Sequence, residues 1–238
     1  MEMVKNPPAS ENMDRLAECI SVAQSSFRDI LNSYLNERST TIEQYIRYLS
    51  FQYHLTKGVQ KYFFAIAAHS DLRKKRSLRD FLCNFAREEE LHYLVAANDL
   101  LSFGQKPLPI TIDVELWHSY FTEVVRERPF VRLGAATILE NISGGVARNS
   151  VKRALSGSFL NKGNTKFLVL HQHEALPHGD QILEAIESAE LDDRQFSDLI
   201  EGAKKGTVLY MRMAEWAIRP TCLASICDGR QVVASEDE

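Results

Sequence analysis

Apolar side chains recur every three or four residues along most of this chain, the spacing that places them on one face of an α-helix. The first repeat runs through Leu16, Ile20, Ala23, Phe27 and Leu31. No convincing period-two pattern of β-strands separates the helical stretches. The spacing predicts seven helical segments, at about residues 10–35, 41–68, 77–102, 113–127, 129–155, 165–189 and 192–220.

Helices joined by short connections predict an all-α bundle with a central cavity. The chain has 238 residues, of which 45% are apolar, so it can bury one substantial core. We therefore expect a single domain over residues 1–220. The helical periodicity stops after Pro220, and the last four residues are mostly acidic, which predicts an irregular tail over residues 221–238.

The composition argues against several classes of protein. The 28 basic and 32 acidic residues give a net charge of −4 without the positive face that nucleic acid binding requires. The longest apolar run, residues 63–68, is far shorter than the roughly 20 residues of a membrane span. The four cysteines form no Cys-x-x-Cys pair, which argues against a zinc site or a disulfide framework. We expect a cytoplasmic homodimer without nucleic acid or membrane partners.

Glu140 is an isolated acid in an apolar run. Its neighbours predict a helix buried on most sides, where an unpaired carboxylate would cost several kcal/mol. A cation must compensate this charge, either an arginine such as Arg132 or Arg148, or a metal ion. The residues three and four positions away on the same helix face are small, which leaves room for a metal, dioxygen or a substrate: Ala136, Thr137, Ser143 and Gly144.

Two further stretches combine histidine with glutamate. Glu89 and His92 have the Glu-x-x-His spacing of helical diiron proteins, and Glu88 competes with Glu89 for the same role. In the other stretch, His171, Glu174 and His178 share a helix face, because offsets of three and seven residues lie within roughly 60° of one another.

The assignment within the second stretch depends on a regular helix. His173 points away from the shared face in a regular helix. Pro177 can distort the helix by clashing with the carbonyl of His173, and this would shift the register by about a residue. Both readings of residues 171–178 therefore stay open.

Together, these stretches predict a site for two Fe(II) ions. Carboxylates and imidazoles hold ferrous iron while leaving positions open for dioxygen, and the number of ligands exceeds what one metal needs. Glu140 and a second glutamate are the expected bridges, and Glu140 and His171 are the residues expected to be essential for catalysis. The six predicted metal ligands are Glu89, His92, Glu140, His171, Glu174 and His178.

On these residues the chain resembles the heme-oxygenase-like diiron oxidase family over roughly residues 81–183. Members carry Glu and His on one core helix, Glu on the next, and His-x-x-x-Asp-x-x-His on a later helix. This sequence keeps histidines at 171 and 178, but position 175 is Ala and the acid stands at Glu174. Glu174 either reaches the metal or leaves a ligand position to water, which would hold the second iron weakly.

The resemblance implies a seven-helix heme-oxygenase-like bundle with a central metal cavity. It also implies a labile diiron(II) centre that uses dioxygen to oxidise a small substrate such as an amino acid, an amine or a fatty acid. Within the family the chain looks most like a cyanobacterial nitrile-forming member, which converts a brominated tryptophan to an indole-3-carbonitrile. That likeness implies an amino-acid-like substrate and C–C cleavage with nitrile formation.

Four other interpretations remain open. A ferritin-like diiron protein would use Glu43 as a further ligand, although Thr40 and Glu43 also have the spacing of a helix-capping box. A protein of the same fold without the diiron site could bind heme through His54. It could also be a thiaminase-like hydrolase with Cys83 or another cysteine as the nucleophile. A non-catalytic scaffold would leave the histidine-rich stretch as a polar helix face.

Overall fold

The computed structural model describes residues 9–170 and 178–220, and this part of the chain is helical without a strand. The all-α prediction is therefore confirmed. Two short 3-10 helices, η1 (Ser70–Leu72) and η2 (Gly145–Ala147), accompany the α-helices. The α-helices are α1 (Ala9–Leu35), α2 (Ile42–Thr56), α3 (Gln60–Ala68), α4 (Arg76–Glu89), α5 (His92–Leu101), α6 (Ile112–Val124), α7 (Pro129–Asn141), α8 (Arg148–Ala154), α9 (Lys166–Leu170), α10 (His178–Glu187) and α11 (Asp193–Ile218).

Several predicted segments are interrupted where the backbone leaves the helix. Gly58, with a φ of 77°, separates α2 from α3, and a β-region Gly144 precedes η2. The segment predicted over 77–102 breaks after Glu89, because Leu91 has φ and ψ angles of −109° and 5°. That break separates α4 from α5 and lies next to two of the predicted ligands.

Capping boxes begin two of the helices, α2 and α11. Asp192, where the last predicted helical segment begins, caps α11 and forms a capping box with Gln195. The capping box of α2 is formed by Thr41 and Gln44, so the predicted pairing of Thr40 with Glu43 was wrong by one residue. The Thr40 hydroxyl instead donates to the carbonyl of Ala154.

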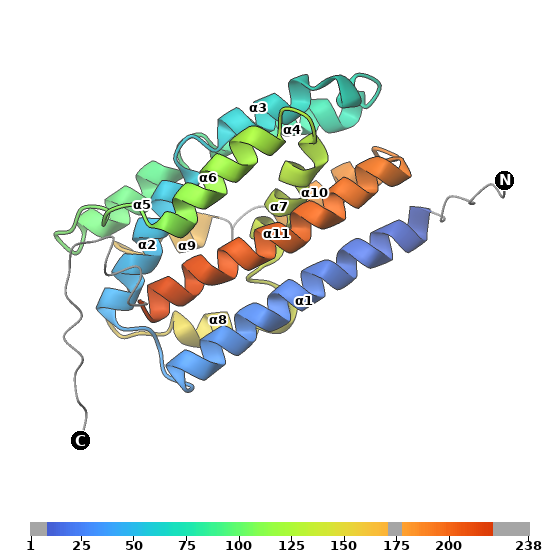
Figure 1. Ribbon diagram of the computed structural model, residues 1–238. Helices are drawn as coiled ribbons and strands as arrows, with labels where there is room; N and C mark the ends of the chain where they lie inside the picture. Colours follow the sequence, from blue (N-terminus) through green and yellow to red (C-terminus); the bar gives the residue numbers. More distant parts are fainter. Residues whose placement is uncertain (1–8, 171–177, 221–238) are drawn as a thin grey trace.

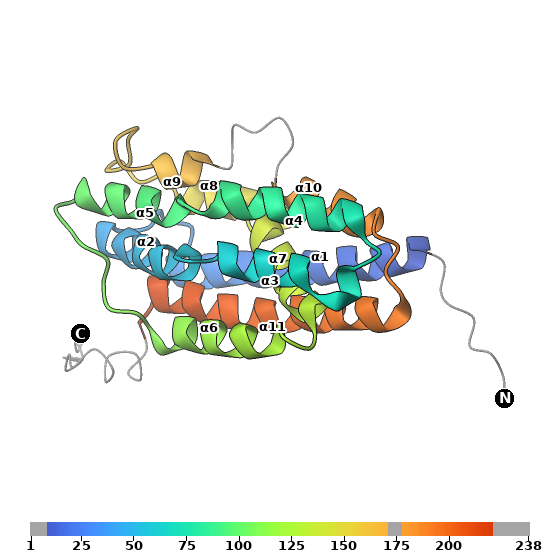
Figure 2. The ribbon, with the colours of Figure 1, turned by 90° about the horizontal axis from the view of Figure 1, so that it is seen from above.

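The long helices α1 and α11 run side by side, and α11 packs along the buried helix α7 (Figure 1). Seen from above, α4 and α5 form one layer, α2 and α3 lie next to it, and α6 and α11 lie on the opposite side (Figure 2). Gly134 and Gly202 allow α7 and α11 to touch. A Cβ atom at Gly134 would overlap the Leu199 carbonyl oxygen, and one at Gly202 would overlap that of Val131.

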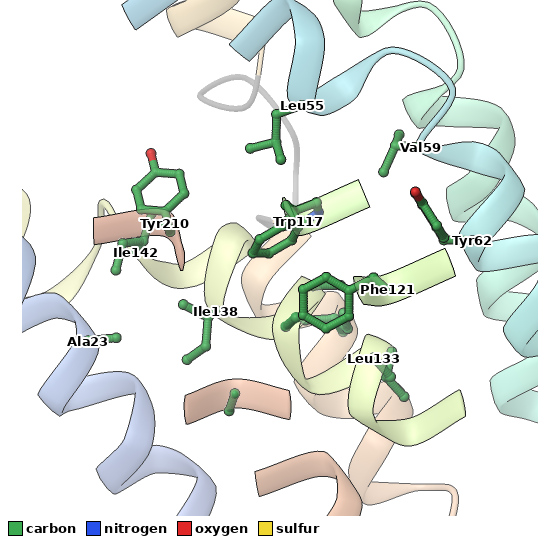
Figure 3. Close-up of a cluster of buried hydrophobic side chains, with 14 of the residues drawn as sticks. Ala23, Leu55, Val59, Tyr62, Trp117, Phe121, Leu133, Ile138, Ile142 and Tyr210 are labelled. Atoms are coloured by element: carbon green, nitrogen blue, oxygen red, sulfur yellow. The ribbon is translucent and has the colours of Figure 1, made fainter. Parts of the chain in front are cut away.

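The core surrounds α7 with large rings. Trp117 and Phe121 pack with ring centroids 4.6 Å apart and are fully buried, and Figure 3 shows them beside α7. Among the described residues, no helix is both long and apolar enough to cross a bilayer. The domain limits at residues 1–220 stay a prediction, and the predicted tail lies outside the described residues.

Candidate metal centre

Glu89, Glu140 and His178 meet inside the bundle from three helices. Each offers one ligand atom, and these atoms lie within 4.8 Å of one another. Nδ1 of His178 lies 3.1 Å from Oε1 of Glu89 and 3.5 Å from Oε2 of Glu140. The side chains are 2%, 6% and 15% exposed for His178, Glu89 and Glu140, so the cluster is largely shielded from water.

The amphipathic pattern of α4 delivers Glu89 to this position. The buried face of α4 carries Leu78, Leu82, Phe85 and Ala86, and Glu89 is the one charged residue on it. Since helix periodicity directs this face into the core, the last residue of α4 brings a carboxylate into the bundle. Glu140 comes from the last turn of α7, whose preceding residues, 129–138, are all buried.

Gly179 allows His178 to approach Glu140. A Cβ atom at Gly179 would lie 2.5 Å from Oδ1 of Asn141 and 2.9 Å from the carbonyl oxygen of Glu140, so a side chain does not fit. The Asn141 amide donates to the carbonyl of Thr137 at 2.9 Å and is 3.4 Å from that of Gly179. The first turn of α10 therefore lies directly against the end of α7.

His92 and Glu88 border the cluster. Nδ1 of His92 is 2.8 Å from Oε2 of Glu89, and its ring stacks with that of His178 at a centroid distance of 6.3 Å. Glu88 is 55% exposed, and its Oε2 lies 3.6 Å from Nε2 of His178. Of the two competing acids, Glu89 lies in the buried cluster and Glu88 lies at its edge.

Aromatic rings close one side of the site. The Phe85 ring meets the His178 imidazole edge to face at 4.7 Å, and Phe63 meets Phe85 in the same way at 4.9 Å. Such a wall excludes water and strengthens electrostatic interactions inside the site. Phe63 and Phe85 thus form part of the core around the cluster.

The two carboxylates dominate the electrostatics of His178. Burial alone would lower the pKa of this imidazole, but hydrogen bonds and charges from Glu140 and Glu89 raise it to about 10. Metal ligands must be deprotonated, so a cation that binds here would take the place of the imidazolium proton. Two carboxylates and one imidazole are a donor set suited to divalent iron, and a ferrous ion fits the chemistry of these residues.

Arg132 is not the partner of Glu140. It is fully buried on α7, and its guanidinium carbon lies 4.9–5.7 Å from the ring centroids of Tyr62, Phe63, Trp117 and Phe121. Within the described part of the chain, none of its three guanidinium nitrogens has a hydrogen-bond partner. Arg148 is exposed on α8. The structure therefore pairs Glu140 with His178 and with neither of these arginines.

The structure describes only some of the other residues predicted for the site. His171, Glu174, His173 and Pro177 lie outside the described residues, so their assignments stay predictions. Glu43 is exposed in the first turn of α2.

The structure also describes His54 and Cys83, the residues named for the heme and thiaminase-like alternatives. Nε2 of His54 is 2.7 Å from the carbonyl oxygen of Leu108, and Cys83 is a partly buried free thiol packed against the core. Sequence reasoning missed Gly179, for which a glycine directly after a candidate ligand was the available signal.

Comparison with known proteins supports the fold. No protein-family model and no curated protein matches the chain. A solved structure from Shewanella denitrificans OS217, a domain of unknown function with a heme oxygenase-like fold, superposes with a TM-score of 0.68 at 21% identity. The match covers 87% of this chain and 90% of that chain. At this identity the likeness shows the fold alone, and the predicted heme-oxygenase-like fold is confirmed.

Proposed function

We propose that this protein is a non-heme diiron oxidase that uses dioxygen to oxidise a small amino-acid-like substrate. The observation that carries the proposal is the convergence of Glu89, Glu140 and His178 from three helices. Two largely buried carboxylates beside imidazoles form a site whose negative charge a divalent metal would compensate. The heme-oxygenase-like fold agrees with this function and does not specify it.

Each residue has a distinct role in the proposed centre. Glu140 and Glu89 would bridge or bind the metals, and His178 would bind through a ring nitrogen. His92 would bind beside Glu89, whose Oε2 orients the His92 ring at 2.8 Å. His171 and Glu174 would complete the six ligands. Two ferrous ions would supply the electrons that dioxygen activation needs and that these side chains cannot supply.

The protein side chains would also prepare the site. Phe85 and Phe63 exclude water from the side of His178, and the close packing of Gly179 fixes the distance between α10 and α7. The narrower proposal, conversion of a halogenated tryptophan to an indole-3-carbonitrile, depends on the family resemblance alone. A homodimer and a cytoplasmic location also remain proposals.

Anaerobic Fe(II) titration of the metal-free protein, followed by elemental analysis, tests the proposal. We expect about two iron ions per chain, and Glu140→Ala should lose iron while keeping its helical content. Glu43→Ala is the matched control, because Glu43 is exposed on α2. Iron loss in Glu43→Ala would favour a ferritin-like site. Wild-type protein that binds no iron would refute the diiron oxidase.

A further inference from the structure

A pocket lies among α1, α2, α8 and α11. Its cavity volume is about 80 Å³, which is larger than a single water needs and suits a small group. Ser143, in the turn that follows α7, contributes to the wall and stands three residues after Glu140. The pocket therefore extends to the end of α7 that carries Glu140.

Aromatic rings form one continuous wall of this pocket. Tyr210 meets Phe27 at 5.8 Å and Phe51 at 5.9 Å, both edge to face, and Phe51 meets Tyr48 at 5.4 Å in the same way. These rings belong to three different helices, α1, α2 and α11. Figure 3 includes Tyr210 in the buried cluster together with Ile142, which follows α7 directly. The wall is thus a rigid part of the core.

Polar groups in the wall are already engaged with the protein. The Thr40 hydroxyl donates to the carbonyl of Ala154 at 2.8 Å, and the Tyr45 hydroxyl donates to that of Asn164 at 2.9 Å. The Gln44 amide donates to the carbonyl of Ile218 at 3.0 Å. Because these groups have partners, they offer a ligand little hydrogen bonding.

No charged side chain is among the described residues that line the pocket. A charged group inside it would lose its water without gaining an ionic partner, which is costly. An uncharged apolar group would instead displace water from apolar walls, and this is favourable. The chemistry of the walls therefore selects neutral apolar ligands.

Tyr210, on the wall of the pocket, is influenced by the charge of Glu140. Burial, the neighbouring Tyr48 and the charge of Glu140 together raise the pKa of Tyr210 above its usual value. The Tyr210 hydroxyl also accepts from the Gln52 amide at 3.4 Å. Tyr210 is therefore a wall residue that lies within the electrostatic reach of Glu140.

We infer that this pocket receives the uncharged apolar part of the substrate, with the atom to be oxidised held beside Glu140. The inference rests on the proposed oxidase function and deepens it. It assigns substrate selection to a region formed by α1, α2, α8 and α11, whereas the candidate ligands come from α4, α5, α7 and α10 and from residues 171–177. An amino-acid-like substrate would insert its side chain here and keep its charged groups outside the pocket.

Calorimetric titration of the metal-free protein with indole and with 1-octanol tests this inference with an uncharged ring and an uncharged chain. We expect one binding site for at least one probe. Ala214→Phe places a ring in the pocket from α11 and should weaken that binding at least tenfold. Val208→Phe adds the same ring at a position of α11 that is 61% exposed, and should bind like the wild type.

The outcomes separate the pocket from the metal site. If Ala214→Phe does not fold, Val151→Phe narrows the pocket from α8 and should have the same effect. Failure of the wild type to bind either probe would overturn the inference, as would wild-type binding by a folded pocket variant. Iron titration of the same proteins tests the proposed oxidase separately from the pocket, because probe binding is measured without metal.

Discussion

Nδ1 of His178 lies 3.1 Å from Oε1 of Glu89, so the first residue of α10 contacts the last residue of α4. Both residues stand at helix ends, where the chain leaves or enters the bundle. This contact, completed by Glu140 at 3.5 Å, depends on how three helix ends are packed together. Substitutions that move one helix end should therefore affect the metal site before they affect the rest of the fold.

Gly179→Ala should separate α10 from α7. The added methyl group would lie 2.5 Å from Oδ1 of Asn141, and such overpacking costs roughly 1–3 kcal/mol. We expect a lower melting temperature and Fe(II) affinity at least tenfold below that of the wild type, measured by anaerobic titration. Asp180→Ala, at the exposed neighbouring position, should change neither. Wild-type iron affinity in Gly179→Ala would show that this close contact does not set the site.

Glu89→Gln and Glu88→Gln should differ sharply in iron content. Both substitutions remove one negative charge at adjacent positions of α4. Glu89 is in the buried cluster and Glu88 is 55% exposed at its edge. We expect Glu89→Gln to lose most of its iron and Glu88→Gln to retain it, as measured by elemental analysis. The reverse result would transfer the ligand role to Glu88.

Arg132→Met should preserve iron binding, because the Arg132 guanidinium forms no hydrogen bond with Glu140 and its charge acts on that carboxylate only at longer range. Burial lowers the pKa of Arg132 to about 10, so the charged form is disfavoured, whereas each ring contact contributes roughly 0.5–2 kcal/mol. Methionine removes both effects, and we expect the free energy of unfolding to change by less than about 2 kcal/mol. Arg132→Ala, which leaves a cavity, should lose roughly 3–5 kcal/mol in denaturant titrations. Loss of iron in a folded Arg132→Met protein would contradict this assignment.

The ion pair of Arg128 with Glu201 should make stability fall in acid. Hydrogen bonds from Arg128 and Lys205 lower the pKa of Glu201 to about 2 from 4.5. Because the folded state lowers this pKa, the stabilisation is complete above pH 4.5 and is lost as pH falls from 4.5 towards 2. Melting temperatures measured across this range should fall less steeply in Arg128→Met than in the wild type. Equal slopes would show that the ion pair contributes nothing measurable.

The sequence predicted most of the fold because helical periodicity and caps are local signals. The Asp192 cap and the buried face of α7 around Glu140 are examples. The break between Glu89 and His92 had no local signal, since no glycine or proline lies between them. Tertiary packing sets such a break, and sequence periodicity alone extended the helix through it.

Part of the candidate site could also be predicted from local sequence signals. A carboxylate in an apolar helix, such as Glu140, predicts a nearby cation, because burying an unpaired charge is costly. By contrast, Gly179 matters only because Asn141 lies against it, and the four rings around Arg132 come from two helices, α3 and α6. Those relationships arise from the packing of distant segments, which a single sequence does not contain.

Anomalous diffraction at the iron edge, from crystals grown anaerobically with ferrous iron, tests the central claim most directly. We expect two iron peaks within the site, with Glu89, Glu140 and His178 among their ligands. An absence of any peak between these three side chains, in crystals that contain ferrous iron, would contradict the diiron centre.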